Sequence, residues 1–120
     1  MSKQKQKGTL AETAVADYLK QYFPAVERRT LGGQFDKGDI AGVPNAVIEV
    51  KNQKAYKFPE WVKETETERI NAGEPIGVLV VKPNGVGVSK VDQWWCLVSL
   101  ETLATLLKDF DAQRLQSSSD

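Results

Sequence analysis

The chain has 120 residues, with 16 Lys and Arg against 16 Asp and Glu, no histidine and one cysteine. A chain of this length is typical of one domain, which can bury a core without disulfide or zinc staples. The missing histidine excludes a Ser-His-Asp triad, a histidine general acid and a histidine-ligated zinc. The lone Cys96 excludes an internal disulfide and a multi-cysteine metal site. Carboxylates, lysines and a metal ion remain available for catalysis.

The zero net charge hides an asymmetry between the two halves of the chain. Residues 1–57 carry ten Lys and Arg against six Asp and Glu, a net charge of +4. Residues 58–120 carry six against ten, a net charge of −4. The first half is therefore suited to an anionic partner, although surface scatter of charge explains the same numbers equally well.

Targeting signals are missing from the sequence. No apolar run reaches the roughly 18 residues of a membrane span. The basic N-terminus is not followed by the apolar stretch of a signal peptide. We therefore expect an intracellular, cytoplasmic protein that does not contact a membrane.

The N-terminal region is predicted to contain an arm and a helix. Residues 1–8 (MSKQKQKG) are polar and basic, which is typical of a flexible arm. Thr9 and Glu12 have capping-box spacing, so a helix is expected from about residue 10 to residue 23. Pro24 would end it.

Three strands are expected next, with a glycine-rich loop at 32–38 after the first of them. Pro44-Asn45 predicts a hairpin turn between the second and third strands. The expected strands span 25–31, 39–43 and 46–51.

The second half of the chain predicts two helices and two strands. Pro59 suits the first turn of a helix, Gly73 suits a helix end, and Ser99 suits an N-cap. These elements are expected at 58–71 (helix), 76–82 (strand), 94–98 (strand) and 100–113 (helix), followed by a disordered tail at 114–120. The element order is α-β-β-β-α-β-β-α, which predicts an α/β domain over residues 9–113, with helices on both faces of a mixed central sheet.

The strand at 46–51 carries the residues that suggest chemistry. Alternate residues of a strand share a face, so Glu49 and Lys51 lie opposite Ile48. Asp39 begins the neighbouring strand and lies across from Glu49 if the hairpin register allows it. The sequence therefore predicts two carboxylates and an ammonium group side by side.

Two neighbouring carboxylates repel each other unless a cation lies between them. Mg²⁺ prefers carboxylate and carbonyl oxygens, and the Val50 carbonyl is a further candidate ligand. Such an ion polarises a phosphoryl oxygen and lowers the pKa of a bound water, while Lys51 orients that water or offsets transition-state charge. This arrangement predicts phosphodiester hydrolysis without histidine.

Each of these residues also has an ordinary structural explanation. Glu49 and Lys51 suit a weak ion pair on a solvated strand. Asp39 suits a turn, and Glu12 suits a helix cap. Their order and spacing taken together favour the functional interpretation.

The order of these residues resembles that of the PD-(D/E)XK nuclease superfamily: Glu12 in a first helix, then Gly38-Asp39-Ile40, then Ile48-Glu49-Val50-Lys51. With Lys7-Gly8-Thr9 before Glu12, the pattern is most similar to Holliday junction resolvases of the archaeal type. The resemblance covers about residues 7–82.

The resemblance implies a restriction-endonuclease-like three-layer fold and a Mg²⁺-dependent endodeoxyribonuclease, with Mn²⁺ able to substitute. The substrate would be branched DNA, and the enzyme would be a homodimer. The implied catalytic residues are Glu12, Asp39, Glu49 and Lys51. The implied metal ligands are Asp39 and Glu49, with Glu12 binding a second metal or a metal-bound water, and the Val50 carbonyl remains the further candidate ligand. Gly38 departs from the proline in the superfamily's name.

DNA binding is expected to rest on the basic first half of the chain, and the resemblance implies that Thr9 contacts a phosphate near the cleaved bond. Phosphate contacts make affinity dependent on salt, and no residue suggests base readout. The acidic run at 60–68 is expected to face solvent, away from DNA. The expected DNA-binding residues are Lys3, Lys5, Lys7, Thr9, Arg28, Arg29, Lys37 and Lys54.

Two alternatives remain open. One is a nuclease of the same superfamily that acts on linear, nicked or damaged DNA. The other is a catalytically inactive nucleic-acid-binding domain on the same fold, against which the intact set of acidic residues and lysine argues.

Overall fold

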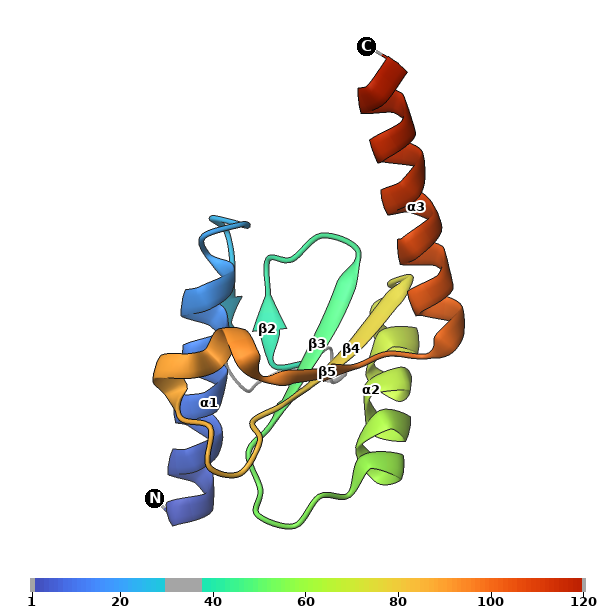
Figure 1. The fold of residues 1–120 in the computed structure, drawn as a ribbon. Helices are drawn as coiled ribbons and strands as arrows, with labels where there is room; N and C mark the ends of the chain where they lie inside the picture. Colours follow the sequence, from blue (N-terminus) through green and yellow to red (C-terminus); the bar gives the residue numbers. More distant parts are fainter. Residues whose placement is uncertain (1, 30–37, 120) are drawn as a thin grey trace.

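The structure is a computed structural model that describes residues 2–29 and 38–119 (Figure 1). The described helices are α1 (Lys3–Leu19), α2 (Phe58–Ala72) and α3 (Leu100–Ser119), with a short 3-10 helix η1 (Val88–Gln93). The described strands are β1 (Glu27–Arg28), β2 (Ile40–Ala41), β3 (Ala46–Lys51), β4 (Ile76–Val81) and β5 (Trp95–Leu97). Apart from η1, this order is the predicted α-β-β-β-α-β-β-α.

The strands of the described residues form one mixed sheet in the order β1-β2-β3-β4-β5. The pair β3–β4 is parallel, and the other neighbouring pairs are antiparallel. The hairpin between β2 and β3 is confirmed, and Asn45 in its turn has φ 68°, a left-handed conformation that asparagine tolerates. Because α2 connects two parallel strands, it must cross over one face of the sheet.

Helices cover both faces of this sheet (Figure 1). On one face, Val15 of α1 packs in a cluster with Ile48 of β3. On the other face, Trp61 of α2 packs with Leu79 of β4. Glu49 is the register partner of Leu79, so its side chain lies on the α2 side of the sheet.

The structure corrects the expected start of the first helix. Helix α1 begins at Lys3, and the Lys5 N–H donates to Oγ of its N-cap Ser2 at 3.2 Å. Residues 3–8 are therefore helical instead of a flexible arm, and Thr9 lies inside the helix. The Lys and Gln side chains of this segment are good helix formers, and Ser2 supplies the cap that the sequence analysis assigned to Thr9. The helix also ends earlier than expected, at Leu19.

Helix α3 differs from expectation at its C-terminal end. It begins as predicted, with the Thr102 N–H donating to Oγ of Ser99 at 3.1 Å. It then continues to Ser119, so residues 114–119 are helical instead of a disordered tail. Figure 1 shows α3 extending away from the sheet. Its large apolar side chains are exposed, among them Leu100, Leu103, Leu106, Leu107 and Phe110.

None of the helices in the described residues is long and apolar enough to cross a membrane.

Candidate functional site

A cavity of about 610 Å³ lies where α1 meets the C-terminal end of β3. Glu12 of α1, Asp39 just before β2, and Glu49 and Lys51 of β3 all line it. Val50, the expected carbonyl ligand, lines it as well. The structure therefore brings together the residues that the sequence analysis singled out, although they come from three separate segments.

Asp39 is fixed against β3 by two hydrogen bonds. The Val50 N–H donates to Oδ2 of Asp39 at 2.8 Å, and the Asp39 N–H donates to the Ile48 carbonyl at 2.8 Å. A hydrogen bond to an ionised carboxylate stabilises more than one between neutral groups. The Asp39 carboxylate is therefore held beside Glu49.

Gly38 allows this close approach. Its φ is 92°, and a Cβ at this position would lie 2.8 Å from Cγ1 of Val47 and 2.9 Å from the Ile48 carbonyl oxygen. Proline has φ locked near −65° and is incompatible with this conformation. The geometry thus explains why a glycine precedes Asp39 here.

Glu12 reaches the cavity from the middle of α1. Its Oε2 lies 3.6 Å from the Arg28 guanidinium. Burial, together with the charge of Asp39 and a hydrogen bond with its side chain, raises the pKa of Glu12 to about 7, while Arg28 acts in the opposite direction. Near neutral pH this carboxyl therefore populates both protonation states.

Glu49 is the most buried of the cavity carboxylates, at 5% exposed. Its Oε1 lies 3.7 Å from Nζ of Lys51, whereas Oε2 is buried and accepts no hydrogen bond from a donor in the described residues. Burial, followed by the neighbouring carboxyls of Glu68 and Asp39, raises the pKa of Glu49 well above its ordinary range. Without a cation beside it, Glu49 holds a proton at neutral pH.

Lys51 contacts two carboxylates. Its Nζ lies 3.0 Å from Oε2 of Glu64 and 3.7 Å from Oε1 of Glu49. Burial acts to lower the pKa of Lys51, but the hydrogen bond to Glu64 and the nearby carboxylate charges outweigh it and raise the pKa. Lys51 therefore remains an ammonium ion in the cavity.

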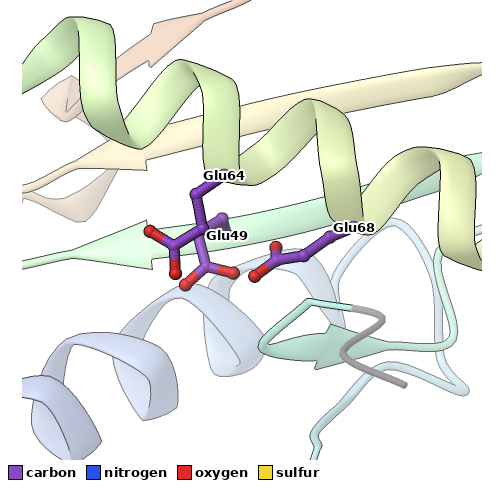
Figure 2. A group of neighbouring side chains, drawn as sticks. All are labelled: Glu49, Glu64 and Glu68. Atoms are coloured by element: carbon purple, nitrogen blue, oxygen red, sulfur yellow. The ribbon is translucent and has the colours of Figure 1, made fainter.

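Helix α2 contributes two carboxylates that the sequence analysis missed. Glu49, Glu64 and Glu68 each offer an oxygen, and these oxygens lie within 4.8 Å of one another. Figure 2 shows the Glu49 carboxylate extending from β3 between the two α2 side chains. These three carboxylates are close enough to hold a metal ion.

The expectation that the acidic run at 60–68 faces solvent is wrong for Glu68, which is 2% exposed. The buried residues Trp61, Thr65 and Glu68 have the i, i+4, i+7 spacing of one helix face. The spacing of Glu68 from Trp61 could have indicated its burial in the sequence, because a tryptophan favours the helix face that packs on the sheet. The many charged side chains of the run mask this spacing in the sequence.

The donor set fits a hard divalent cation. Carboxylate oxygens without imidazole or thiolate groups suit Mg²⁺, Mn²⁺ or Ca²⁺. Within the described residues, Arg28 and Lys51 form ion pairs with carboxyl groups of this region. Four carboxyl groups lie near that of Glu49, and they belong to Glu12, Asp39, Glu64 and Glu68.

Basic side chains also border the cavity. Lys7 of α1 and Lys54 and Lys57 after β3 line it. The side-chain amide of Asn52 donates to the Lys7 carbonyl at 3.2 Å, which connects α1 to the segment after β3. Three ammonium groups therefore lie near the carboxylates.

The remaining residues expected to bind DNA are more scattered. Lys3 and Lys5 are exposed in the first turns of α1, and Thr9 is half-buried in it. Arg28 pairs with Glu12, and Arg29 is exposed after β1. Lys37 lies outside the described residues.

Comparison of the chain with protein-family models, curated proteins and solved structures found no match.

Proposed function

We propose that this protein is a metal-dependent DNA endonuclease of the PD-(D/E)XK type with a restriction-endonuclease-like fold. One observation carries the proposal: Glu12, Asp39, Glu49 and Lys51 line a single cavity. These four residues are the catalytic set that the sequence resemblance implies. A mixed sheet with α1 and α2 on opposite faces is compatible with this fold.

Mg²⁺ is the proposed cofactor, with Mn²⁺ as a substitute. Asp39, Glu49, Glu12 and the Val50 carbonyl would hold it. When bound, the ion supplies Lewis-acid polarisation of the phosphate and raises the acidity of the attacking water.

The chain's own side chains would perform the other tasks. The Val50 N–H keeps the Asp39 carboxylate directed to the cavity. Lys51 offsets negative charge that develops on the phosphate oxygens during attack. Glu12, a further acidic side chain of the cavity, would hold the ion or a water beside it.

The proposed substrate is branched DNA, most like a Holliday junction. Lys7, Lys54 and Lys57 line the same cavity as the proposed catalytic residues, and they would contact phosphates near the cleaved bond. Such contacts position the backbone without reading bases, which favours recognition of DNA shape. A homodimer would provide one active site for each of two strands, and the exposed apolar side chains of α3 support self-association.

A labelled four-way junction and a linear duplex of the same sequence test this proposal. Each is incubated with Mg²⁺ or EDTA, using wild type, Glu49→Gln, Lys51→Ala and the control Glu101→Gln, which changes an exposed carboxylate on α3. We expect paired symmetric nicks in the junction alone, lost with EDTA and in the first two variants but retained in Glu101→Gln.

Other outcomes separate the alternatives. Equal cutting of junction and duplex would retain the nuclease and reject junction specificity. Tight DNA binding without metal-dependent cutting of either substrate would support the inactive binding domain and overturn the proposed activity.

A further inference from the structure

We propose that Glu49, Glu64 and Glu68 bind a divalent cation between β3 and α2, in addition to the ion proposed at Asp39. Glu64 and Glu68 belong to neither the sequence motif nor the proposed catalytic set. The inference concerns cation binding, and it rests on the proposed function only in calling this ion the second one.

The separation of the three side chains fits a single ion. Mg²⁺ and Ca²⁺ bind oxygens at about 2.0–2.6 Å, so ligands on opposite sides of an ion lie about 4–5 Å apart. The oxygens of the three glutamates lie within 4.8 Å of one another. Small rotations of the side chains would therefore complete this part of a coordination shell.

Glu49 provides an independent sign that a ligand belongs here. Its side chain is 7% exposed, yet its Oε2 accepts no hydrogen bond from a donor in the described residues. A buried carboxylate that faces other carboxyl groups is costly unless a proton or a cation lies between them, and a coordinated cation removes that cost. Figure 2 shows this carboxylate directed between Glu64 and Glu68.

The local charge also favours a divalent ion. Lys51 is the ammonium that contacts Glu49 and Glu64, at 3.7 Å and 3.0 Å. A cation that binds here displaces the proton from Glu49, and the single positive charge of Lys51 then leaves the three carboxylates with a net charge of −2, which one divalent cation neutralises. Because all three donors are carboxylates, the site suits Mg²⁺, Mn²⁺ or Ca²⁺.

A second cavity borders the α2 carboxylates. Glu64 and Glu68 line a second cavity of about 380 Å³ along α2, together with residues that include Glu60 and Thr67. This cavity shares no lining residue with the cavity that contains Asp39. The α2 carboxylates therefore border a cavity other than the one that Asp39 lines.

Mn²⁺ binding to the full chain tests the inference without any cleavage assay. Stoichiometry and affinity are measured by electron paramagnetic resonance of free Mn²⁺ and by calorimetry, with circular dichroism to verify folding. We expect wild type to bind two Mn²⁺ per chain. Glu68→Gln and Glu64→Gln should each lose one and retain the ion at Asp39, whereas Asp39→Asn should retain the ion on α2.

Glu66→Gln is the matched control, because Glu66 lies on the same helix and pairs with Arg69 at 2.7 Å, outside the cluster. It should bind two Mn²⁺ like wild type. Wild-type stoichiometry and affinity of Mn²⁺ binding in Glu64→Gln would overturn the inference. The Glu64 side chain is exposed, so this substitution should not prevent folding. Absence of DNA cleavage with both ions bound would reject the proposed activity and leave the inference standing.

Discussion

The side chain of Asp39 and the main chain of Val50 are joined by a hydrogen bond of 2.8 Å between Oδ2 and N–H. The two residues belong to the two arms of the β2–β3 hairpin, so this bond links the position of one cavity carboxylate to the central strand. Asp39 therefore accepts a hydrogen bond from β3 in addition to its proposed role as a charged metal ligand.

Asp39→Asn and Asp39→Ala should therefore differ in stability but not in activity. The asparagine amide oxygen can still accept from Val50, whereas alanine leaves that N–H without its acceptor and should cost about 1–3 kcal/mol. Urea unfolding in EDTA measures the difference. Both variants should lose DNA cleavage by at least about 100-fold, because each removes the ligand charge. Equal stability of the two variants would contradict the structural role of the hydrogen bond.

The metal-free protein should become less stable as pH rises from about 4.5 to about 7. Glu12 has a pKa raised from 4.5 to about 7, so the folded protein binds more protons than the unfolded chain in this window. Stability then falls with rising pH, and the contribution of Glu12 levels off above about 7. The raised pKa of Glu49 continues the decline at higher pH.

Melting temperatures recorded in EDTA between pH 5 and pH 8 test this dependence. Glu12→Gln should show a smaller decline than wild type, because glutamine does not titrate. Glu101→Gln, which alters an exposed carboxyl, should follow wild type. An unchanged slope in Glu12→Gln would show that Glu12 does not carry the effect.

Gly38→Ala should destabilise the protein by about 1–3 kcal/mol. The backbone φ is 92°, and the added Cβ would meet Val47 and the Ile48 main chain at less than 3 Å. Gly87→Ala is the control, because its φ is −75° and no atom lies within 4 Å of the added Cβ. Chemical unfolding of both variants measures the contrast, and similar stabilities would reject the proposed strain at Gly38.

Lys54→Ala should weaken DNA binding without changing the preference for a junction over a duplex. Each lost phosphate contact lowers the slope of log affinity against log salt by about one. Fluorescence anisotropy at several salt concentrations measures this slope. Lys108→Ala, which removes a lysine from α3, should leave it unchanged. A wild-type slope in Lys54→Ala would exclude Lys54 from the DNA contact.

Leu107→Asp should shift the protein from dimer to monomer if α3 mediates self-association. Leu107 is 60% exposed within the apolar side of the helix, so a charge there should disrupt an interface while leaving the fold of the monomer intact. Thr105→Asp is the control, because Thr105 is an exposed residue of the same helix outside the apolar set. Sedimentation analysis distinguishes the states, and a dimer in Leu107→Asp would place the interface elsewhere.

The order of the elements could be predicted because its signals are local. The alternation of strand 46–51 placed Glu49 and Lys51 on one face, and Pro44-Asn45 predicted the hairpin that brings Asp39 to them. The predicted strand has the observed bounds, Ala46–Lys51. Period-2 patterning and turn residues act within a few positions, so they can be recognised in a single sequence.

The ends of α1 and α3 were less predictable. A helix near a chain end is stabilised by its cap and by residues that favour helix formation. The same polar residues are also common in disordered segments. Ser2 capped a helix over residues assigned to an arm, and α3 continued through residues assigned to a tail. Composition alone does not separate an exposed helix from a mobile segment.

The sequence alone determined that Glu49 and Lys51 lie on the same face of the strand, because alternate side chains of a strand point to the same side. Tertiary structure decided which carboxylates surround that face. Glu68 becomes buried beside Glu49 only because α2 crosses over β3 and β4 with the Trp61 face toward the sheet. The distance between side chains on separate elements depends on packing and register, which no local pattern specifies.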